Sequence, residues 1–199
     1  MSLDDAPRIH PANADEWRAW LEANHDTATG VWLVTWRSPE SGGEPLPYED
    51  QVLEALAFGW IDATTRRLDD DRRMQYFAPR KRGSAWARSN KARVERLRAE
   101  GRMAPAGEAA IERAVADGSW ALLDDVENLV VPDDLTAAFE RHPGSRAQWE
   151  TFPPSSRQMA LWWIRQAKRP ETRAKRIEET ARLAAEGIRA NEPRRPGVG

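Results

Sequence analysis

A six-residue run of β-branched and aromatic side chains at residues 31–36 (VWLVTW) constrains the fold more than any other feature of the sequence. Successive side chains on a strand point to opposite faces of a sheet, so a run that is apolar at nearly every position predicts a strand covered on both faces. Gly30 and the Gly/Pro-rich segment 38–47 bound the run and predict loops on either side. The sequence therefore predicts a buried strand at residues 31–36.

Two further strands are predicted at residues 60–67 and 73–79. Three consecutive aspartates, Asp69–Asp71, lie between them. Aspartate favours turns because its side chain accepts hydrogen bonds from nearby backbone N–H groups. The pattern therefore predicts an antiparallel hairpin whose turn is at these aspartates.

The register of this hairpin decides which side chains meet. With the turn centred near Asp70, Trp60 lies opposite Arg80 and Asp62 lies opposite Ala78. Asp62 and Arg80 are then diagonal neighbours within reach of each other. A shift of one residue would turn each side chain to the other face, so the register stays a hypothesis.

Helical periodicity, capping residues and terminal glycines predict helices through the rest of the chain. The predicted helices span residues 15–24, 49–58, 84–100, 105–117, 131–139, 145–151, 155–164 and 170–186. In this interpretation Ser84 caps one helix, and Ser155 and Gln158 form a capping box before the apolar run 159–164. We expect that run at the centre of the helical half, because it is apolar on all sides.

The predicted class is α+β: a small antiparallel sheet of about three strands with helices in the N-terminal half, and an all-helical C-terminal half. The best boundary lies near residues 101–105. We therefore expect an α+β subdomain at 1–103, a helical subdomain at 104–190, and a disordered tail at 191–199 rich in Pro, Arg and Gly.

The amino-acid composition argues against disulfides, metal sites and cofactor-binding sites. The chain has no cysteine, which excludes disulfides and thiolate metal ligands. Its three histidines, His10, His25 and His142, are far apart in sequence, so we expect no metal site. Neither a P-loop nor a dinucleotide-binding glycine motif is present, and we expect no cofactor.

The N-terminal segment is acidic and lacks an apolar run, which argues against a signal peptide. The longest apolar run, 159–164, is too short to cross a bilayer. We therefore expect a cytoplasmic protein that does not insert into a membrane.

Charge is distributed unevenly along the chain. Residues 64–103 hold 13 basic and 5 acidic side chains, whereas residues 1–63 hold 3 basic and 12 acidic ones. The basic block could dock onto the acidic one within the fold or form a surface that attracts an anion. Nucleic-acid binding is the weakest alternative, because the whole chain is acidic with a pI near 6.0.

Glu54 and Asp62 are the candidate acid–base pair, one on a helix and the other early in the next strand. Two carboxylates can perform acid–base chemistry where their environments separate their pKa values. The alternative, which we favour, is that Asp62 pairs with Arg80 and that Glu54 faces solvent. Catalysis is thus left open, and a protein that is not an enzyme is favoured.

Asn90 is a second candidate, because it lies four residues after Trp86 and four before Val94, on the apolar stripe of its predicted helix. A buried amide needs hydrogen-bond partners, which a loop or a ligand could supply. Arg80 and Ser84 stand at the start of the same predicted helix, where an anion could bind.

The last predicted helix places Arg169, Arg173 and Arg176 on one face, with Lys168 beside them. Such a face could bind phosphate or carboxylate. Charged stripes are more often solvated faces with i,i+4 pairs, so both interpretations are kept.

Three motifs resemble the YdeI/OmpD-associated family, also called the bacteriocin-protection family. They are EALxFGWID at 54–62, FxPRxxxSxWxxxN at 77–90, and AKRPETRAKRI at 167–177. The resemblance runs from about residue 17 to residue 187 and implies an indirect link to bacteriocin or antimicrobial-peptide resistance. The family supplies no catalytic residues. Candidate ligand-binding residues are those where the motifs and the physical interpretation agree: Glu54, Trp60, Asp62, Arg80, Ser84, Trp86, Asn90, Lys168 and Arg173.

The favoured hypothesis is a binding module for an anionic small molecule or an acidic peptide. In it Arg80 and Arg173 bind the anion, Trp60 and Trp86 form the walls of a cleft, and Asn90 orients the ligand. The alternatives, in order, are a protein that binds an acidic protein partner without a ligand, a carboxylate-based enzyme, and a nucleic-acid binder. Monomer and homodimer both stay open.

Overall fold

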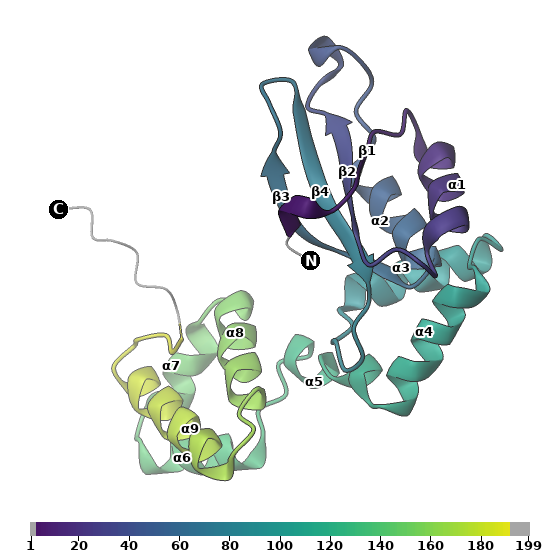
Figure 1. Cartoon of the computed structure of the whole chain (residues 1–199). Helices are drawn as coiled ribbons and strands as arrows, with labels where there is room; N and C mark the ends of the chain where they lie inside the picture. The colour runs from purple at the N-terminus through teal and green to yellow at the C-terminus, as the bar shows by residue number, and fades with distance from the viewer. Residues whose placement is uncertain (1–2, 192–199) are drawn as a thin grey trace. The chain divides into compact units, whose positions relative to one another are not determined.

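The computed structural model describes residues 3–191 and divides the chain into two compact units, Met1–Leu122 and Leu123–Gly199 (Figure 1). The first unit is α+β and the second is helical, which confirms the predicted class. The division follows Leu122, later than the predicted boundary near residues 101–105. The predicted tail lies outside the described residues, except for Asn191.

The sheet of the first unit has four strands in the order β1-β2-β4-β3. They are β1 (Arg8–Ile9), β2 (Val31–Trp36), β3 (Trp60–Arg67) and β4 (Arg72–Pro79). β1 runs parallel to β2, whereas β2–β4 and β4–β3 are antiparallel. The prediction of about three antiparallel strands is therefore corrected to a four-stranded mixed sheet. Two residues are too few for a periodic signal, which is why β1 was not predicted.

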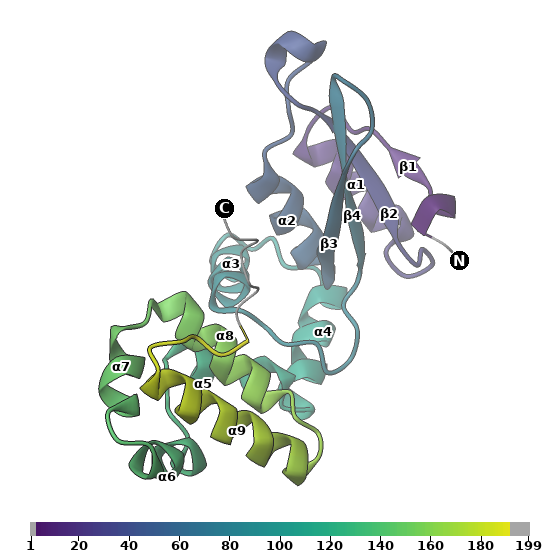
Figure 2. The same ribbon diagram turned by 90° about the vertical axis from the view of Figure 1, so that its left-hand side faces the viewer.

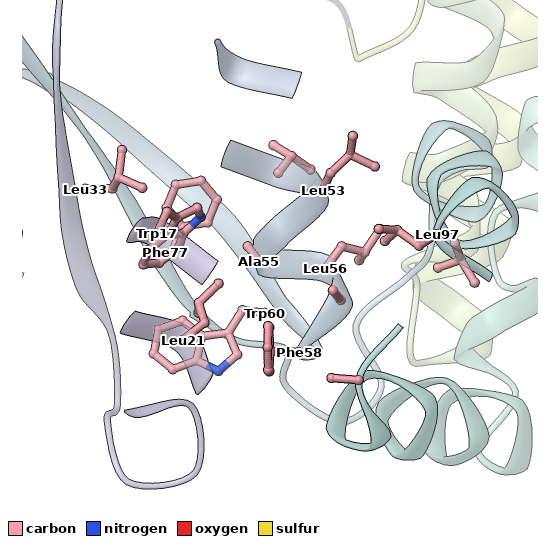
Figure 3. Close-up of a cluster of buried hydrophobic side chains, with 14 of the residues drawn as sticks. Trp17, Leu21, Leu33, Leu53, Ala55, Leu56, Phe58, Trp60, Phe77 and Leu97 are labelled. Carbon is pink, nitrogen blue, oxygen red and sulfur yellow. The ribbon is translucent and has the colours of Figure 1, made fainter. Parts of the chain in front are cut away.

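Strand β2 is covered on both faces, as its sequence predicts. Val31 and Leu33 belong to the main hydrophobic cluster, whereas Trp32 and Val34 belong to a smaller cluster on the opposite face. Helices α1 (Ala14–Asn24) and α2 (Tyr48–Ala57) pack over the main cluster. Figure 3 shows this cluster, which also includes Trp17, Leu21, Leu53, Leu56, Trp60 and Phe77.

The hairpin forms with its turn at the predicted aspartates. The Asp69 carboxylate accepts hydrogen bonds from the backbone N–H of Asp71 at 3.1 Å and of Arg72 at 2.7 Å. Its other oxygen accepts from the Arg72 guanidinium at 2.6 Å. One side chain thus fixes the direction in which β4 begins.

Helix α3 (Arg88–Ala99) begins four residues later than predicted, and Ser84 does not cap it. Ala87 occupies the N-cap position in an extended conformation. Trp86 belongs to the main cluster and packs against Trp120, with 5.0 Å between their ring centroids. Burial of this indole holds the segment before α3 extended, which outweighs the capping preference of Ser84.

Helix α4 (Pro105–Ala116) belongs to the first unit because it packs closely against the end of α2. A Cβ atom added at Gly107 would lie 2.2 Å from the carbonyl oxygen of Ala57. The same carbonyl accepts a hydrogen bond from the backbone N–H of Ala104 at 3.0 Å. Because α4 packs this closely against α2, the boundary between the two units follows α4 rather than precedes it.

The second unit consists of α5 (Asp124–Glu127), α6 (Asp133–Arg141), α7 (Ser145–Thr151), α8 (Pro154–Arg165) and α9 (Pro170–Ala185). Figure 2 shows α9 lying along α8. The predicted capping box is wrong: α8 begins at Pro154, and Ser155 and Gln158 both lie inside the helix. Pro154 suits the first helical turn, because the backbone there needs no N–H donor.

The apolar run 159–164 is only partly central to the second unit. Ala160, Leu161 and Ile164 are buried in its hydrophobic cluster. Met159 is 38 % exposed, so the run presents one face to the core rather than all its sides. Within residues 3–191 no helix is long and apolar enough to cross a membrane.

Candidate functional site

The face of the sheet that α2 covers changes from apolar to polar along the strands. Paired residues of an antiparallel ladder share a face. Val31 pairs with Phe77 in the core, followed by Leu33 with Gln75 and then Thr35 with Arg73. The core therefore ends where Gln75 and Arg73 begin, and polar groups line the sheet beyond that point.

A cavity of about 480 Å³ lies over this polar end of the sheet. Its walls come from the N-terminal part of α2 and from strands β2, β3 and β4. The lining residues are Thr35, Tyr48, Gln51, Asp62, Ala63, Thr64, Thr65, Arg73 and Gln75. Nearly all of them carry hydroxyl, amide or charged groups. We call this space the polar cavity.

A bulge in β3 brings two polar residues to the cavity. Asp62 pairs with Phe77, but the next pair along β3 is Thr65 with Gln75, so β3 carries one extra residue there. Without the bulge, residues three apart on a strand would point to opposite faces. Because of it, Asp62 and Thr65 both line the cavity, as bulges near functional sites often arrange.

Hydrogen bonds fix the carboxylate of Asp62 in the cavity wall. Its Oδ2 atom accepts from the Tyr48 hydroxyl at 2.9 Å and from the Gln75 amide at 3.4 Å. The Gln75 carbonyl oxygen in turn accepts from the Thr65 hydroxyl. Asp62 Oδ1 accepts no hydrogen bond from any residue between 3 and 191, which leaves it available to a donor.

Tyr48 remains a hydrogen-bond donor at neutral pH. Burial raises the pKa of its hydroxyl, and the hydrogen bond to Asp62 and the charge of that carboxylate raise it further. Proton loss would put a second negative charge next to Asp62. The pair is therefore a protonated hydroxyl that donates to an ionised acid, which suits binding more than proton transfer.

Arg73 is the cation of the cavity. It is exposed, and its side chain makes no hydrogen bond, ion pair or ring contact with any residue that the structure describes. The sequence analysis missed Arg73. A usable signal was the alternation Arg73–Gln75–Phe77, which extends the core-facing row of β4 by two polar members.

Glu54 does not face solvent, which corrects the expectation for it. Its side chain is only 2 % exposed. The carboxylate forms a salt bridge with the Arg18 guanidinium at 2.9 Å and a second one with the Arg102 guanidinium. Each carboxylate oxygen is bonded to one guanidinium. A carboxylate engaged in this way holds helices together and is poorly placed to act as a base.

The predicted Asp62–Arg80 pair is not found, because the hairpin register differs by one residue. Trp60 lies opposite Pro79 rather than Arg80, and Asp62 lies opposite Phe77 rather than Ala78.

Arg80 instead folds back onto its own loop. Its guanidinium donates to the carbonyl oxygen of Ala85 at 2.7 Å and stacks 3.9 Å from the ring centroid of Trp86. Burial of the cation lowers the pKa of Arg80 to about 10. Arg80 and Ser84 line a small crevice next to α4 and are not among the residues that line the polar cavity, although the charge of Asp62 acts to raise the pKa of Arg80.

The two candidate tryptophans are core residues. Trp60 is buried and donates its indole N–H to the carbonyl oxygen of His25 at 3.2 Å. Trp86 is buried as well. Neither ring lines the polar cavity.

Asn90 lies in the first turn of α3, where its amide oxygen accepts from the Arg93 guanidinium at 2.9 Å. Arg93 also binds the Glu49 carboxylate, with a shortest contact of 2.7 Å. Asn90 therefore supports an ion pair between α2 and α3.

Lys168 and Arg173 belong to the second unit. Arg173 forms two hydrogen bonds with the Asp134 carboxylate, at 2.7 and 3.0 Å. Lys168 is exposed in the turn before α9. Among residues 3–191 no group of three or more histidine, aspartate or glutamate side chains is placed to hold a metal ion.

These features define a protein with an α+β domain that carries a polar cavity, followed by a helical domain. The chain belongs to the family described as "Domain of unknown function (DUF8412)", whose model matches residues 9–110, just over half of the sequence. Residues 128–187 match the model described as "Bacteriocin-protection, YdeI or OmpD-Associated". Among curated proteins and among solved structures, neither search gave a significant match.

The predicted resemblance is thus confirmed for the helical unit, which contains the motif at 167–177. The motifs at 54–62 and 77–90 fall within the region that matches the other family. The polar cavity lies within that region as well.

Proposed function

We propose that the N-terminal unit binds a small anionic molecule in the polar cavity. The observation that carries this proposal is Arg73, a guanidinium without a partner among the described residues, in a cavity where hydrogen bonds fix Tyr48, Asp62 and Gln75. A guanidinium presents a planar set of donors that matches a carboxylate or a phosphate. The cavity volume, about 480 Å³, is in the usual range for small-molecule sites.

Asp62, which lines the same cavity as Arg73, specifies a second feature of the ligand. Asp62 Oδ1 is available to accept a hydrogen bond, because Tyr48 and Gln75 both bond to Oδ2. A ligand that fits therefore carries an anionic group toward Arg73 and a hydroxyl or amine donor toward Asp62. A small molecule suits the cavity better than an acidic peptide, since the site is a cavity of limited volume rather than an extended groove.

The test is a thermal-shift series on the full chain with succinate, malate, citrate and inorganic phosphate. Ligand at about a hundred times its dissociation constant should stabilise the folded state by roughly 2.7 kcal/mol. We expect Arg73→Ala to abolish the shift. Arg113→Ala is the matched control, because it removes the same charge from an exposed position on α4.

An equal shift in wild type and Arg73→Ala would contradict the proposal, and so would the absence of any shift with all four anions. Asp62→Asn separates the two halves of the site. We expect it to weaken malate, which carries a hydroxyl, more than succinate, which does not.

The family match of residues 128–187 supports a second, cellular proposal. Its description names bacteriocin protection, and we propose that this chain contributes to it indirectly, from the cytoplasm. The test compares bacteriocin killing of a deletion strain complemented with wild type or with Arg73→Ala. Equal survival of the deletion strain and its parent would contradict the proposal.

A further inference from the structure

A second cavity of about 430 Å³ adjoins the polar cavity. Its lining residues are Arg37, Thr65, Arg66, Arg67 and Arg73. Thr65 and Arg73 line both cavities, so the two spaces meet at these side chains. The second space, which we call the arginine cavity, is lined by residues of β3 and β4 and by Arg37, which follows β2.

Two of the four arginines have carboxylate partners and two do not. Arg66 pairs with Asp4, and Arg67 pairs with Asp70. Within residues 3–191 the Arg37 side chain donates only to the backbone carbonyl oxygen of Asp70, at 3.5 Å. Neither Arg37 nor Arg73 contacts a carboxylate of any residue between 3 and 191. The arginine cavity therefore carries an excess of two positive charges.

The turn carries two other carboxylates, Asp69 and Asp71, and the first is already engaged. Asp69 binds the side chain of Arg72, and hydrogen bonds from that arginine lower the pKa of the Asp69 carboxyl. The Asp69 carboxylate stays ionised and paired at neutral pH. The exposed Asp71 side chain forms no ion pair with Arg37 or Arg73, so no direct ion pair within residues 3–191 neutralises these two arginines.

A phosphate monoester matches this excess better than a single carboxylate. It carries about −1.5 to −2 charges at pH 7 and three acceptor oxygens, enough for two guanidiniums at once. Arginine is also the side chain best suited to bidentate phosphate contacts.

The polar cavity defines the other half of the ligand. Its lining offers the Asp62 carboxylate and hydroxyl and amide groups of Tyr48, Thr65 and Gln75. Tyr48 is the one aromatic residue among those lining groups. Such a wall fits a hydroxyl-rich group better than a flat nucleobase, which prefers aromatic faces.

We infer that the two cavities form one site for a phosphorylated polyol, with the phosphate between Arg37 and Arg73 and the hydroxyl groups against Asp62 and Gln75. This inference rests on the proposed function and names the class of ligand for it. The shared residues, Thr65 and Arg73, lie where the phosphate joins the polyol.

The test is calorimetric titration of the full chain at constant ionic strength with ribose 5-phosphate, ribose, inorganic phosphate and adenosine 5′-monophosphate. We expect ribose 5-phosphate to bind at least about tenfold more tightly than inorganic phosphate, because only it occupies both cavities. Ribose alone should give no measurable heat. The nucleotide should bind more weakly than ribose 5-phosphate, since the polar cavity offers its base little aromatic surface.

Variants separate the two halves. Arg37→Ala should lower the affinity for ribose 5-phosphate and for phosphate by about tenfold or more, the usual size of a lost charge-assisted hydrogen bond. Asp62→Asn should weaken ribose 5-phosphate and leave inorganic phosphate unchanged. Arg113→Ala should leave both unchanged, and a thermal melt of each variant shows that it is folded.

Ribose 5-phosphate binding no tighter than phosphate, or unaffected by Arg37→Ala, would overturn the inference. Tighter binding of the nucleotide, or of a short oligonucleotide, would overturn the assignment to a polyol. If carboxylates bind through Arg73 but phosphates do not, the inference falls and the proposed function stands. If no probe depends on Arg73, both fall.

Discussion

Arg18 on α1 donates to the buried carboxylate of Glu54 on α2 across 2.9 Å, although 36 residues separate them in the sequence. Arg102, in the turn after α3, bonds to the other oxygen of the same carboxylate. Arg18 also donates to the backbone carbonyl oxygen of Arg102 at 3.2 Å. One carboxylate therefore joins three segments of the first unit.

Replacing Glu54 should destabilise the first unit strongly. Glu54→Gln leaves two guanidiniums facing a buried neutral amide, and we expect the free energy of unfolding to fall by about 3 kcal/mol. Urea denaturation followed by tryptophan fluorescence measures the loss. Glu22→Gln is the control, because Glu22 contacts Arg18 at 3.3 Å from an exposed position and its loss should cost less than about 1 kcal/mol. If the two variants lost the same free energy of unfolding, the buried Glu54 network would not be a major source of the stability of the first unit.

This network shows why local patterns predicted the elements but not their contacts. The hairpin was predictable because Asp69 bonds to N–H groups only two and three residues away. The partners of Glu54 are 36 and 48 residues away, and no local pattern contains them. Sequence reasoning placed Glu54 on a helix correctly and its environment wrongly.

Gly107 provides a test of how closely α4 and α2 approach. Glycine-to-alanine changes in helices usually stabilise a protein by up to about 1 kcal/mol. At Gly107 the added methyl group would lie 2.2 Å from the carbonyl oxygen of Ala57, so we expect a loss of about 2 kcal/mol instead. Chemical denaturation of Gly107→Ala gives the sign directly. Glu112→Ala, at an exposed position of the same helix, should stay within about 0.5 kcal/mol of wild type.

Arg80 should be replaceable without loss of stability by a side chain of similar length. Its Nε and Nη1 atoms are buried and find no hydrogen-bond partner among residues 3–191. Met would remove this desolvation cost and still fill the space over Trp86, so Arg80→Met should be as stable as wild type or up to about 2 kcal/mol more stable. Arg80→Ala should instead lose about 2 kcal/mol, because it leaves a cavity. Unfolding curves in which Arg80→Ala is more stable than Arg80→Met would contradict this account.

The candidate site was harder to predict than the fold. The sequence predicted the hairpin correctly, and Asp62 as a site residue stays a prediction, but the bulge between Asp62 and Thr65 carries no local signature. That bulge moves Asp62 away from Arg80 and opposite the row that ends in Arg73. The register at Asp62 therefore removes the predicted ion pair with Arg80, and Arg73, at the end of the facing row, has no side-chain partner among the described residues.

The ion pair between Asp134 and Arg173 should make the second unit sensitive to acid. Hydrogen bonds from Arg173 lower the pKa of the Asp134 carboxyl in the folded state. A lowered folded-state pKa stabilises the fold above the unfolded value, near 4, and this stabilisation is lost as pH falls through the folded value. Arg173→Ala should cost about 0.5 kcal/mol at pH 7, since both side chains are partly exposed, and nothing once Asp134 is protonated.

Unfolding of wild type and Arg173→Ala at several pH values between 7 and 2 measures this difference. Lys168→Ala removes the same charge from an exposed turn and should show a difference that does not change with pH. A constant gap between Arg173→Ala and wild type would show that the pair contributes nothing specific.

The Tyr48–Asp62 contact can be followed directly by spectrophotometric titration, because the chain has only two tyrosines. In a Tyr76→Phe background the phenolate signal comes from Tyr48 alone, and we expect its pKa to lie above the ordinary value near 10. Asp62→Asn removes the carboxylate charge and should lower that pKa toward the ordinary value, although burial still keeps it raised. An unchanged titration curve in Asp62→Asn would show that Tyr48 does not donate to Asp62 in solution, and the wall of the polar cavity would then lack the fixed acid on which the proposed ligand binding depends.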